Sequence, residues 1–155
     1  MSENLKLSIV IPVYNEEKFI LEVLNRIENL DCGLEKEIVI VDDASADNTK
    51  NILKSTDKYK IFYHEKNQGK GQAILTAAKY AKENGFNEFS SVLGISRYKN
   101  LESVNAAAEI AQKEFDIAYN FTNWRKNSGE QEGIKTVKQL NLYIQNYCGC
   151  EFSKR

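Results

Sequence analysis

The sequence predicts an α/β fold with three layers, in which helices cover both faces of a mainly parallel sheet. Strand-like apolar segments alternate with helix-like segments along the whole chain, which is the pattern of parallel α/β sheets. Residues 37–41 are nearly all apolar, as in strands that are covered on both faces. The chain has 155 residues, one proline and no repeat or linker composition, so we expect a single domain over residues 1–155.

Five strands and five helices are expected. The strands are predicted from β-branched and apolar runs at residues 5–13, 37–41, 60–64, 88–93 and 115–119. Four helices are predicted at residues 15–30, 45–54, 72–83 and 101–113. After a polar stretch at 123–133, a last amphipathic helix is predicted to carry Val137, Leu140, Ile144 and Tyr147.

Helix ends and faces follow from side-chain chemistry. In the first helix an apolar stripe is expected from Phe19, Ile20, Val23, Leu24, Ile27 and Leu30. Asn15 is predicted to cap that helix, and Ser45 or Asp47 the second one. Gly85 is expected to close the helix over 72–83.

Charge and hydropathy exclude some classes of partner. Lys and Arg number 21 against 22 Asp and Glu, a net charge of −1. No global basic field is expected, so neither nucleic acid nor an anionic membrane is a predicted partner. The longest apolar run, around residues 7–13, is too short for a transmembrane segment. The start MSENLKL lacks an export signal, which predicts a cytoplasmic protein.

The spacing of the cysteines and the context of the single histidine do not indicate a catalytic site. Cys148 and Cys150 form one Cys-Gly-Cys, which can indicate metal or redox chemistry. Because no second pair accompanies it, reduced structural thiols are favoured for these two and for Cys32. His64, the only histidine, is interpreted as an ordinary residue at a strand end.

Three loops are expected to share the ligand-binding edge of the sheet. PVYNEE, VDDAS and the start of SVLGISR each follow a predicted strand, and ligands of such sheets bind beyond the carboxyl ends of the strands. A dinucleotide site is disfavoured, because the first strand is not followed by a glycine-rich turn. No GxxxxGK[ST] phosphate loop occurs.

LSIVIPVYNEE, EIVIVDDASADNT and NQGKGQAILTA, in this order, resemble the start of a family 2 glycosyltransferase. The closest likeness is to the dolichyl-phosphate-mannose synthase and polyprenyl-phosphate sugar transferase group, and it is clearest over residues 5–85. The resemblance implies the GT-A fold of nucleotide-diphospho-sugar transferases. It also implies a UDP- or GDP-linked sugar as donor, and a lipid phosphate or saccharide as acceptor.

The resemblance also implies a set of nucleotide-binding residues. Carried over by motif, these are Pro12, Tyr14, Glu16, Val41 and Asp43. The Asp43 carboxylate is expected to accept hydrogen bonds from the base, while Asp42 braces the loop. Contacts to the donor diphosphate are expected from Lys70, Arg97 and Arg125.

The chain departs from that family at its metal motif. Relatives carry Asp-x-Asp with Mg²⁺ or Mn²⁺ after the fourth strand, where this chain has Gly94-Ile95-Ser96. We therefore expect no metal and no cofactor, and no catalytic residue is assigned. Three readings stay open: a metal-independent glycosyltransferase, an inactive member acting as a binding or regulatory module, and a purely structural domain.

Overall fold

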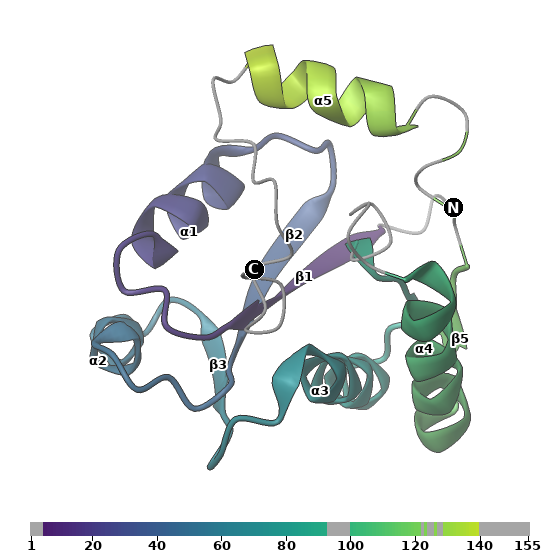
Figure 1. The fold of residues 1–155 in the computed structure, drawn as a ribbon, viewed down its shortest axis with the longest axis horizontal. Coiled ribbons are helices and arrows are strands. Elements are labelled where there is room, and N and C mark those ends of the chain that lie inside the picture. Colours follow the sequence, from purple (N-terminus) through teal and green to yellow (C-terminus); the bar gives the residue numbers. More distant parts are fainter. Residues whose placement is uncertain (1–4, 93–99, 122, 124–125, 127–128, 140–155) are drawn as a thin grey trace. The chain divides into compact units, whose positions relative to one another are not determined.

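A computed structural model describes residues 5–92, 100–121, 123, 126 and 129–139. The chain forms two compact units, Met1–Tyr80 and Ala81–Arg155, which we call the first and the second unit. Figure 1 labels the helices and strands of both. All strand pairs among the described residues are parallel. The predicted α/β class with mainly parallel strands is therefore confirmed.

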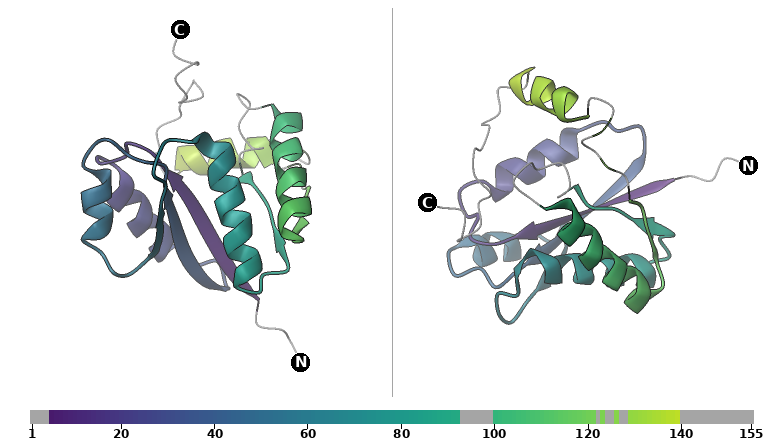
Figure 2. Two further views of the ribbon diagram at one scale, coloured as in Figure 1. Left: turned by 90° about the horizontal axis from the view of Figure 1, so that it is seen from below. Right: turned by 45° about the vertical axis from the view of Figure 1, so that its right-hand side comes forward.

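The first unit is built on a three-stranded sheet. Its elements are β1 (Lys6–Val13), α1 (Ile20–Asn29), β2 (Glu35–Asp42), α2 (Thr49–Lys54), β3 (Lys60–Tyr63) and α3 (Gly69–Glu83), whose last turn belongs to the second unit. The strand order is β1-β2-β3, and the strands lie side by side in every view (Figures 1 and 2). Pro12 is level with Val41, so the loops after β1 and β2 leave the same end of the sheet, as predicted.

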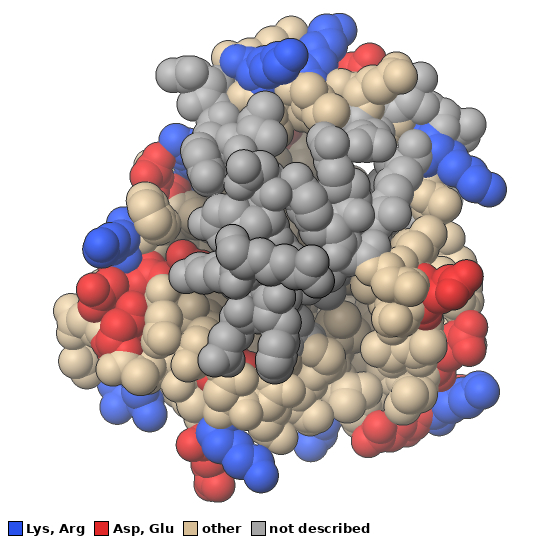
Figure 3. Space-filling view, in the orientation of Figure 1, with Lys and Arg blue, Asp and Glu red and all other residues tan. Residues whose placement is uncertain are grey.

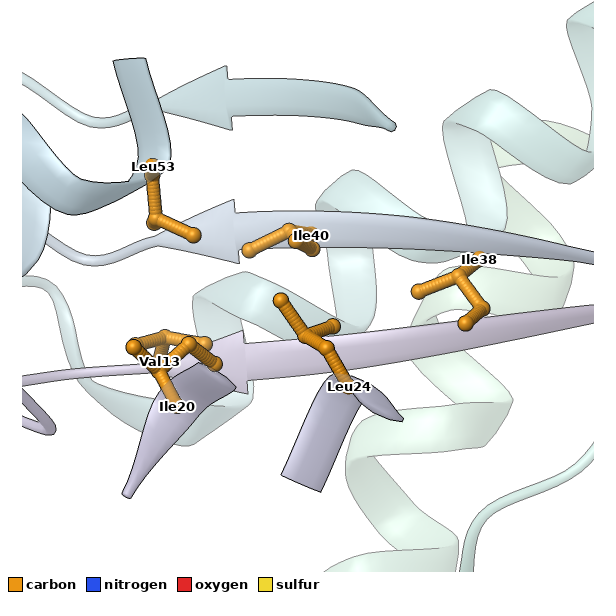
Figure 4. Packing of buried hydrophobic residues seen from close by; sticks show 6 residues of the cluster. All are labelled: Val13, Ile20, Leu24, Ile38, Ile40 and Leu53. Carbon is orange, nitrogen blue, oxygen red and sulfur yellow. The ribbon is translucent and has the colours of Figure 1, made fainter. Parts of the chain in front are cut away.

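β2 is the central strand, and its residues 38–42 are all buried. Because side chains alternate along a strand, Ile38 and Ile40 point to one face. There they form a cluster with Val13, Ile20, Leu24 and Leu53, from β1, α1 and α2 (Figure 4). Val39 and Val41 are also buried. On β3, Phe62 contacts Tyr80 of α3 edge to face, with ring centroids 5.7 Å apart.

α1 is shorter than predicted and buries a narrower stripe. Ile20 and Leu24 are buried, and Ile27 packs against the same cluster. Val23, within the helix, is 40% exposed, and Phe19 and Leu30, just outside it, are 58% and 59% exposed. Half of the predicted stripe therefore faces away from the core.

The two predicted N-caps are wrong, whereas Gly85 closes α3 as predicted, with a left-handed φ of 76° and with the Phe86 N–H donating to the Ala81 carbonyl at 3.0 Å. Phe19 holds the N-cap position of α1 and makes no side-chain cap bond. Asn15 has a left-handed backbone with φ of 53°, and its side chain accepts the backbone N–H of Ala46 at 2.8 Å. It therefore joins two loops. Asn48 occupies the N-cap of α2.

The second unit contains β4 (Glu88–Phe89), α4 (Leu101–Phe115), β5 (Ala118–Tyr119) and α5 (Gly129–Gln139). β4 and β5 pair in parallel as a two-stranded sheet. Asn100 caps α4 by accepting the Ser103 N–H at 3.1 Å. β5 is shorter than predicted because α4 runs on to Phe115, and Asp116 then takes a left-handed turn with φ of 49°.

Three sequence predictions concern the layers of the fold, the number of domains and the last helix. Among the described residues the strands form two separate sheets, so a three-layer GT-A arrangement is not confirmed. The single domain over residues 1–155 stays a prediction. Of the apolar positions predicted for the last helix, Val137 lies in α5; Leu140, Ile144 and Tyr147 lie outside the described residues.

Two surface properties bear on function. In the part of the chain that is described, no helix has the length and apolarity needed to cross a membrane. Basic and acidic side chains are interspersed among the described residues on the face drawn in Figure 3.

Leu24 and Leu21 provide a matched test of the core of the first unit. Leu24→Ala should lower the free energy of unfolding by about 2–5 kcal/mol, because it leaves a cavity at a side chain that is 1% exposed. Leu21→Ala, on the same helix but 59% exposed, should change it by less than about 0.5 kcal/mol. Urea unfolding followed by circular dichroism measures both, and equal costs would contradict the assigned packing of α1.

Candidate functional site

The loops that follow β1 and β2 are tied to one another by side chains. The backbone N–H of Asn15 donates to Ser45 Oγ at 3.0 Å. The next backbone N–H, of Glu16, donates to Thr49 Oγ1 at 2.8 Å. With the bond from Ala46 to the Asn15 side chain at 2.8 Å, these contacts hold the carboxyl edge of the two strands in one arrangement.

Asp42 braces its own loop, as predicted. Its side chain is fully buried, and Oδ1 accepts the Ser45 hydroxyl at 2.5 Å and the Ser45 N–H at 3.3 Å. Oδ2 has no hydrogen-bond partner among the described residues. Burial, and secondly the charge of Asp42, raise the pKa of Tyr63 on the neighbouring strand.

Asp43 connects three segments of the first unit. It is 5% exposed, and its Oδ2 accepts the Gly69 N–H at 2.7 Å. Oδ1 accepts the Gln68 N–H at 3.0 Å and lies 2.7 Å from His64 Nδ1. The carboxylate thus joins the end of β2 to the end of β3 and to the start of α3, where the helix dipole also favours a negative charge.

The carboxylate of Asp43 is held in its ionised form. Burial by itself raises the pKa of this group. The hydrogen bonds from His64 and from the Gln68 and Gly69 amides lower it further than burial raises it, so the pKa lies below its ordinary value. An ionised carboxylate only accepts hydrogen bonds, so His64 Nδ1 carries the donated proton.

His64 extends this arrangement to a hydroxyl. Its Nε2 lies 3.0 Å from Thr76 Oγ1 on α3. In the neutral ring Nε2 accepts the Thr76 proton, and the order carboxylate, imidazole, hydroxyl is one in which a proton can move along the chain. Sequence reasoning missed this role of His64. Its partners are 21 and 12 residues away, and spacing does not indicate such contacts.

The structure brings most of the predicted site residues to one end of the sheet. Pro12 and Glu16 are exposed, and Tyr14 is 47% exposed. Val41 is fully buried, so its side chain serves the core. That these residues and Asp43 contact a ligand stays a prediction. The same holds for the three predicted phosphate contacts, because the Lys70 side chain, Arg97 and Arg125 lie outside the described residues.

The second unit has an aromatic group at the carboxyl edge of its own sheet. The rings of Phe89 and Tyr119 lie 5.0 Å apart, and those of Tyr119 and Phe121 4.8 Å apart. Tyr119 is 7% exposed whereas Phe121 is 48% exposed, and burial raises the pKa of Tyr119. Sequence reasoning missed this group, because Phe89 is thirty residues away from Tyr119 in the sequence.

Among the described residues no group of histidine, cysteine and acidic side chains is arranged to hold a metal. Cys148 and Cys150 are not part of that search, since they lie outside the described residues.

Comparison with known proteins identifies an oxidoreductase family. Residues 45–155, which include the whole second unit, match the family described as epoxyqueuosine reductase QueH. The chain belongs to the epoxyqueuosine reductase QueH family. Residues 1–44, with β1, α1 and β2, lie outside the match.

Individual relatives include reductases of this family. The chain is 49% identical over 80 residues to the epoxyqueuosine reductase QueH of Acinetobacter baylyi, covering 51% of this chain and 37% of that protein. It is also 43% identical over 142 residues to an uncharacterised protein of Methanocaldococcus jannaschii, covering 88% of this chain and 55% of that protein. The chain spans only 33% to 37% of the reductases from Histophilus somni and Acinetobacter baylyi.

A solved structure is also similar over part of the chain. The crystal structure of Staphylococcus aureus TarS in complex with UDP is 35% identical over 50% of this chain and 24% of that one. Its TM-score of 0.43 is too low to support a conclusion about fold or function.

The family assignment overturns the predicted glycosyltransferase. The resemblance, the sugar-transfer activity and the alternative of an inactive glycosyltransferase are wrong. The expected partners are wrong as well, because the relatives are named for a modified nucleoside and not for a nucleotide sugar. The motif residues Asn15, Asp42 and Ser45 bond within and between the two loops, so loop architecture accounts for much of the pattern.

The interpretation of residues 94–96 changes for the same reason. Gly94 and Ser96 lie in the part of the chain that matches the reductase family. Their lack of carboxylates is therefore not the loss of a glycosyltransferase metal site. The expectation of no metal and no cofactor stays a prediction.

Replacing Asp43 tests the central contact of the first unit. Asp43→Asn should lower the free energy of unfolding by about 1.5–3 kcal/mol, because an amide N–H₂ then faces backbone donors and the charge-assisted bonds are lost. Asp57→Asn, at an exposed acid of the same unit, should cost less than about 0.5 kcal/mol.

The same pair of variants has a pH signature. A lowered pKa in the folded state gives stability that is present above the unfolded value and lost as pH falls through the folded one. Below about pH 4 the parent and Asp57→Asn should therefore lose stability more steeply than Asp43→Asn. Urea midpoints from pH 2 to pH 7 measure this, and parallel curves for all three proteins would refute the ionised, buried Asp43.

Proposed function

We propose that this chain takes part in the reduction of epoxyqueuosine. One observation carries the proposal: the reductase family matches residues 45–155, and relatives of that name are 42% to 49% identical over 80 residues. This chain spans about a third of the length of those relatives. The reductase activity in their names is therefore a proposal for this chain.

The name of the substrate defines the chemistry. Converting epoxyqueuosine to queuosine removes an epoxide oxygen. Both carbon–oxygen bonds break, a carbon–carbon double bond forms, and the oxygen leaves as water after taking up two protons and two electrons. The reaction therefore requires an electron donor and a group that passes electrons to the epoxide.

Sulfur is the redox-active side-chain element that the matched region offers. Cys148 and Cys150 lie within residues 45–155, whereas Cys32 does not. Two thiolates supply two electrons by forming a disulfide, and thiolates are also the preferred ligands of iron centres that carry electrons. Cys148 and Cys150 are therefore the proposed redox thiols, in place of the purely structural role that their spacing favoured.

The substrate implies a nucleic-acid partner. Queuosine is a nucleoside of tRNA, so tRNA is the proposed partner and the cytoplasm the proposed location. Arg97 and Arg125, predicted as phosphate contacts, are proposed to meet RNA phosphates instead, since guanidinium groups pair with phosphate oxygens of either kind. Lys70 is proposed for the same role.

We propose the predicted three-layer arrangement, with helices on both faces of a sheet, for the first unit alone. A three-layer arrangement there is supported by the apolar cluster with α1 and α2 on one face of the sheet. The contact of Tyr80, on α3, with Phe62 supports a helix on the other face.

Serine substitutions test the proposed function. Cys148→Ser and Cys150→Ser should abolish conversion of epoxyqueuosine to queuosine in tRNA, because neither variant keeps both thiols. Cys32→Ser is the matched control, at an exposed cysteine outside the family match, and should convert tRNA at the rate of the parent. Nucleosides from treated tRNA are quantified by mass spectrometry, with dithionite as the reductant. A parent chain without conversion, or a Cys148→Ser variant as active as the parent, would contradict the proposal.

A further inference from the structure

We propose that Phe121 is a stacking platform for a base of the RNA substrate. This inference rests on the proposed function and names a residue that positions the substrate. Phe121 follows β5 at the carboxyl edge of the β4–β5 sheet. It is a large aromatic side chain that remains 48% exposed, in the unit that lies wholly within the family match.

The ring of Phe121 is supported from one side. It packs at 81° against Tyr119, with ring centroids 4.8 Å apart. Tyr119 in turn packs against Phe89 at 5.0 Å. Because the planes of Phe121 and Tyr119 are nearly perpendicular, Tyr119 leaves a face of the Phe121 ring uncovered.

The backbone around this ring is fixed by hydrogen bonds. The Asn120 N–H donates to the Phe89 carbonyl at 2.9 Å. The Ser90 hydroxyl donates to the Asn120 carbonyl at 3.1 Å, and the Tyr119 N–H donates to Gln112 Oε1 at 2.7 Å. A fixed backbone before Phe121, together with the packing of its ring on Tyr119, limits the conformational freedom that is lost when a ligand stacks on the ring, which favours binding.

A base that is taken out of its stack needs a new stacking partner, and an exposed aromatic ring can provide one. An enzyme reaches a tRNA nucleoside by taking it, or its neighbour, out of the base stack. Exposed aromatic side chains replace the lost stacking, and every base has a π face that can occupy them. Ligands of parallel α/β sheets also bind beyond the carboxyl ends of the strands, where Phe121 lies.

A basic side chain follows Phe121 in the sequence. Lys126, five residues further along the same loop, is exposed. Its backbone is held in a turn by bonds from its N–H to the Asn123 carbonyl and from the Gly129 N–H to its carbonyl, both 3.1 Å. A stacking surface and a cation are therefore five residues apart in the sequence.

Binding of epoxyqueuosine-containing tRNA tests this role. Phe121→Leu keeps an apolar side chain but has no π face, and should weaken binding about 5- to 150-fold. Phe121→Trp keeps a π face and should bind within about threefold of the parent. Ile110→Ala is the control, at an apolar side chain on α4 that is 59% exposed, and should bind like the parent. Fluorescence anisotropy gives the dissociation constants.

The salt dependence of tRNA binding shows whether a variant has lost stacking or has lost contacts between charged groups. Stacking releases no counterions, so the slope of log affinity against log salt should be the same for Phe121→Leu and the parent. Thermal unfolding curves of all variants show whether packing on Tyr119 is kept. Equal losses of binding in Phe121→Leu and Phe121→Trp would indicate a packing role and overturn the stacking.

The outcomes also distinguish this inference from the proposed function. Suppose that the parent binds and converts the tRNA and that Phe121→Leu binds it equally well. The inference that Phe121 stacks on a base is then wrong, and the proposed reductase function stands. If the parent neither binds nor converts the tRNA, both are wrong.

Discussion

The first unit depends on one buried negative charge. Removing a carboxylate from water is costly unless it is paired and hydrogen-bonded, and Asp43 meets that condition through His64, Gln68 and Gly69. These partners come from the end of β3 and the start of α3, so the same bonds that keep the charge in the interior also fix two connections of the fold. Without them, the Asp43 carboxylate, which is 5% exposed, would be a buried charge without a partner.

The polar loops of the first unit explain why its sequence motifs suggested another class of enzyme. A short polar loop at the carboxyl end of a parallel strand has to satisfy its own backbone groups. Here Asn15, Ser45 and Thr49 do so across two loops. Asn, Asp, Ser and Thr are the residues that form such bonds, so a motif composed of them reports loop architecture as readily as it reports a ligand. The family match over residues 45–155 is the stronger indication of function.

In the second unit the sheet of β4 and β5 is very short, and contacts between aromatic side chains add to those of the strand pair. β4 and β5 contribute two residues each, and the rings of Phe89, Tyr119 and Phe121 continue the contact beyond the strand pair. α4 is anchored at its start by Asn100 and by three buried positions, Val104, Ala108 and Ala111. A large exposed ring at this edge is consistent with a surface that acts on a flat, unstacked ligand.

The sequence by itself determined what depends on neighbours in the chain. Apolar runs and helical periodicity located β1, β2, β3, α3 and α4 to within a few residues, because such patterns reflect local geometry. Only the tertiary structure decided which distant groups meet. It placed His64 against Asp43 and Thr76. It gave Asn15 a bond to a second loop in place of a helix cap, and it brought the ring of Phe89 from β4 against that of Tyr119 from β5. The pairing of β4 with β5 alone, among the described strands, was likewise a choice between partners far apart in the chain, and local periodicity carries no information about that choice.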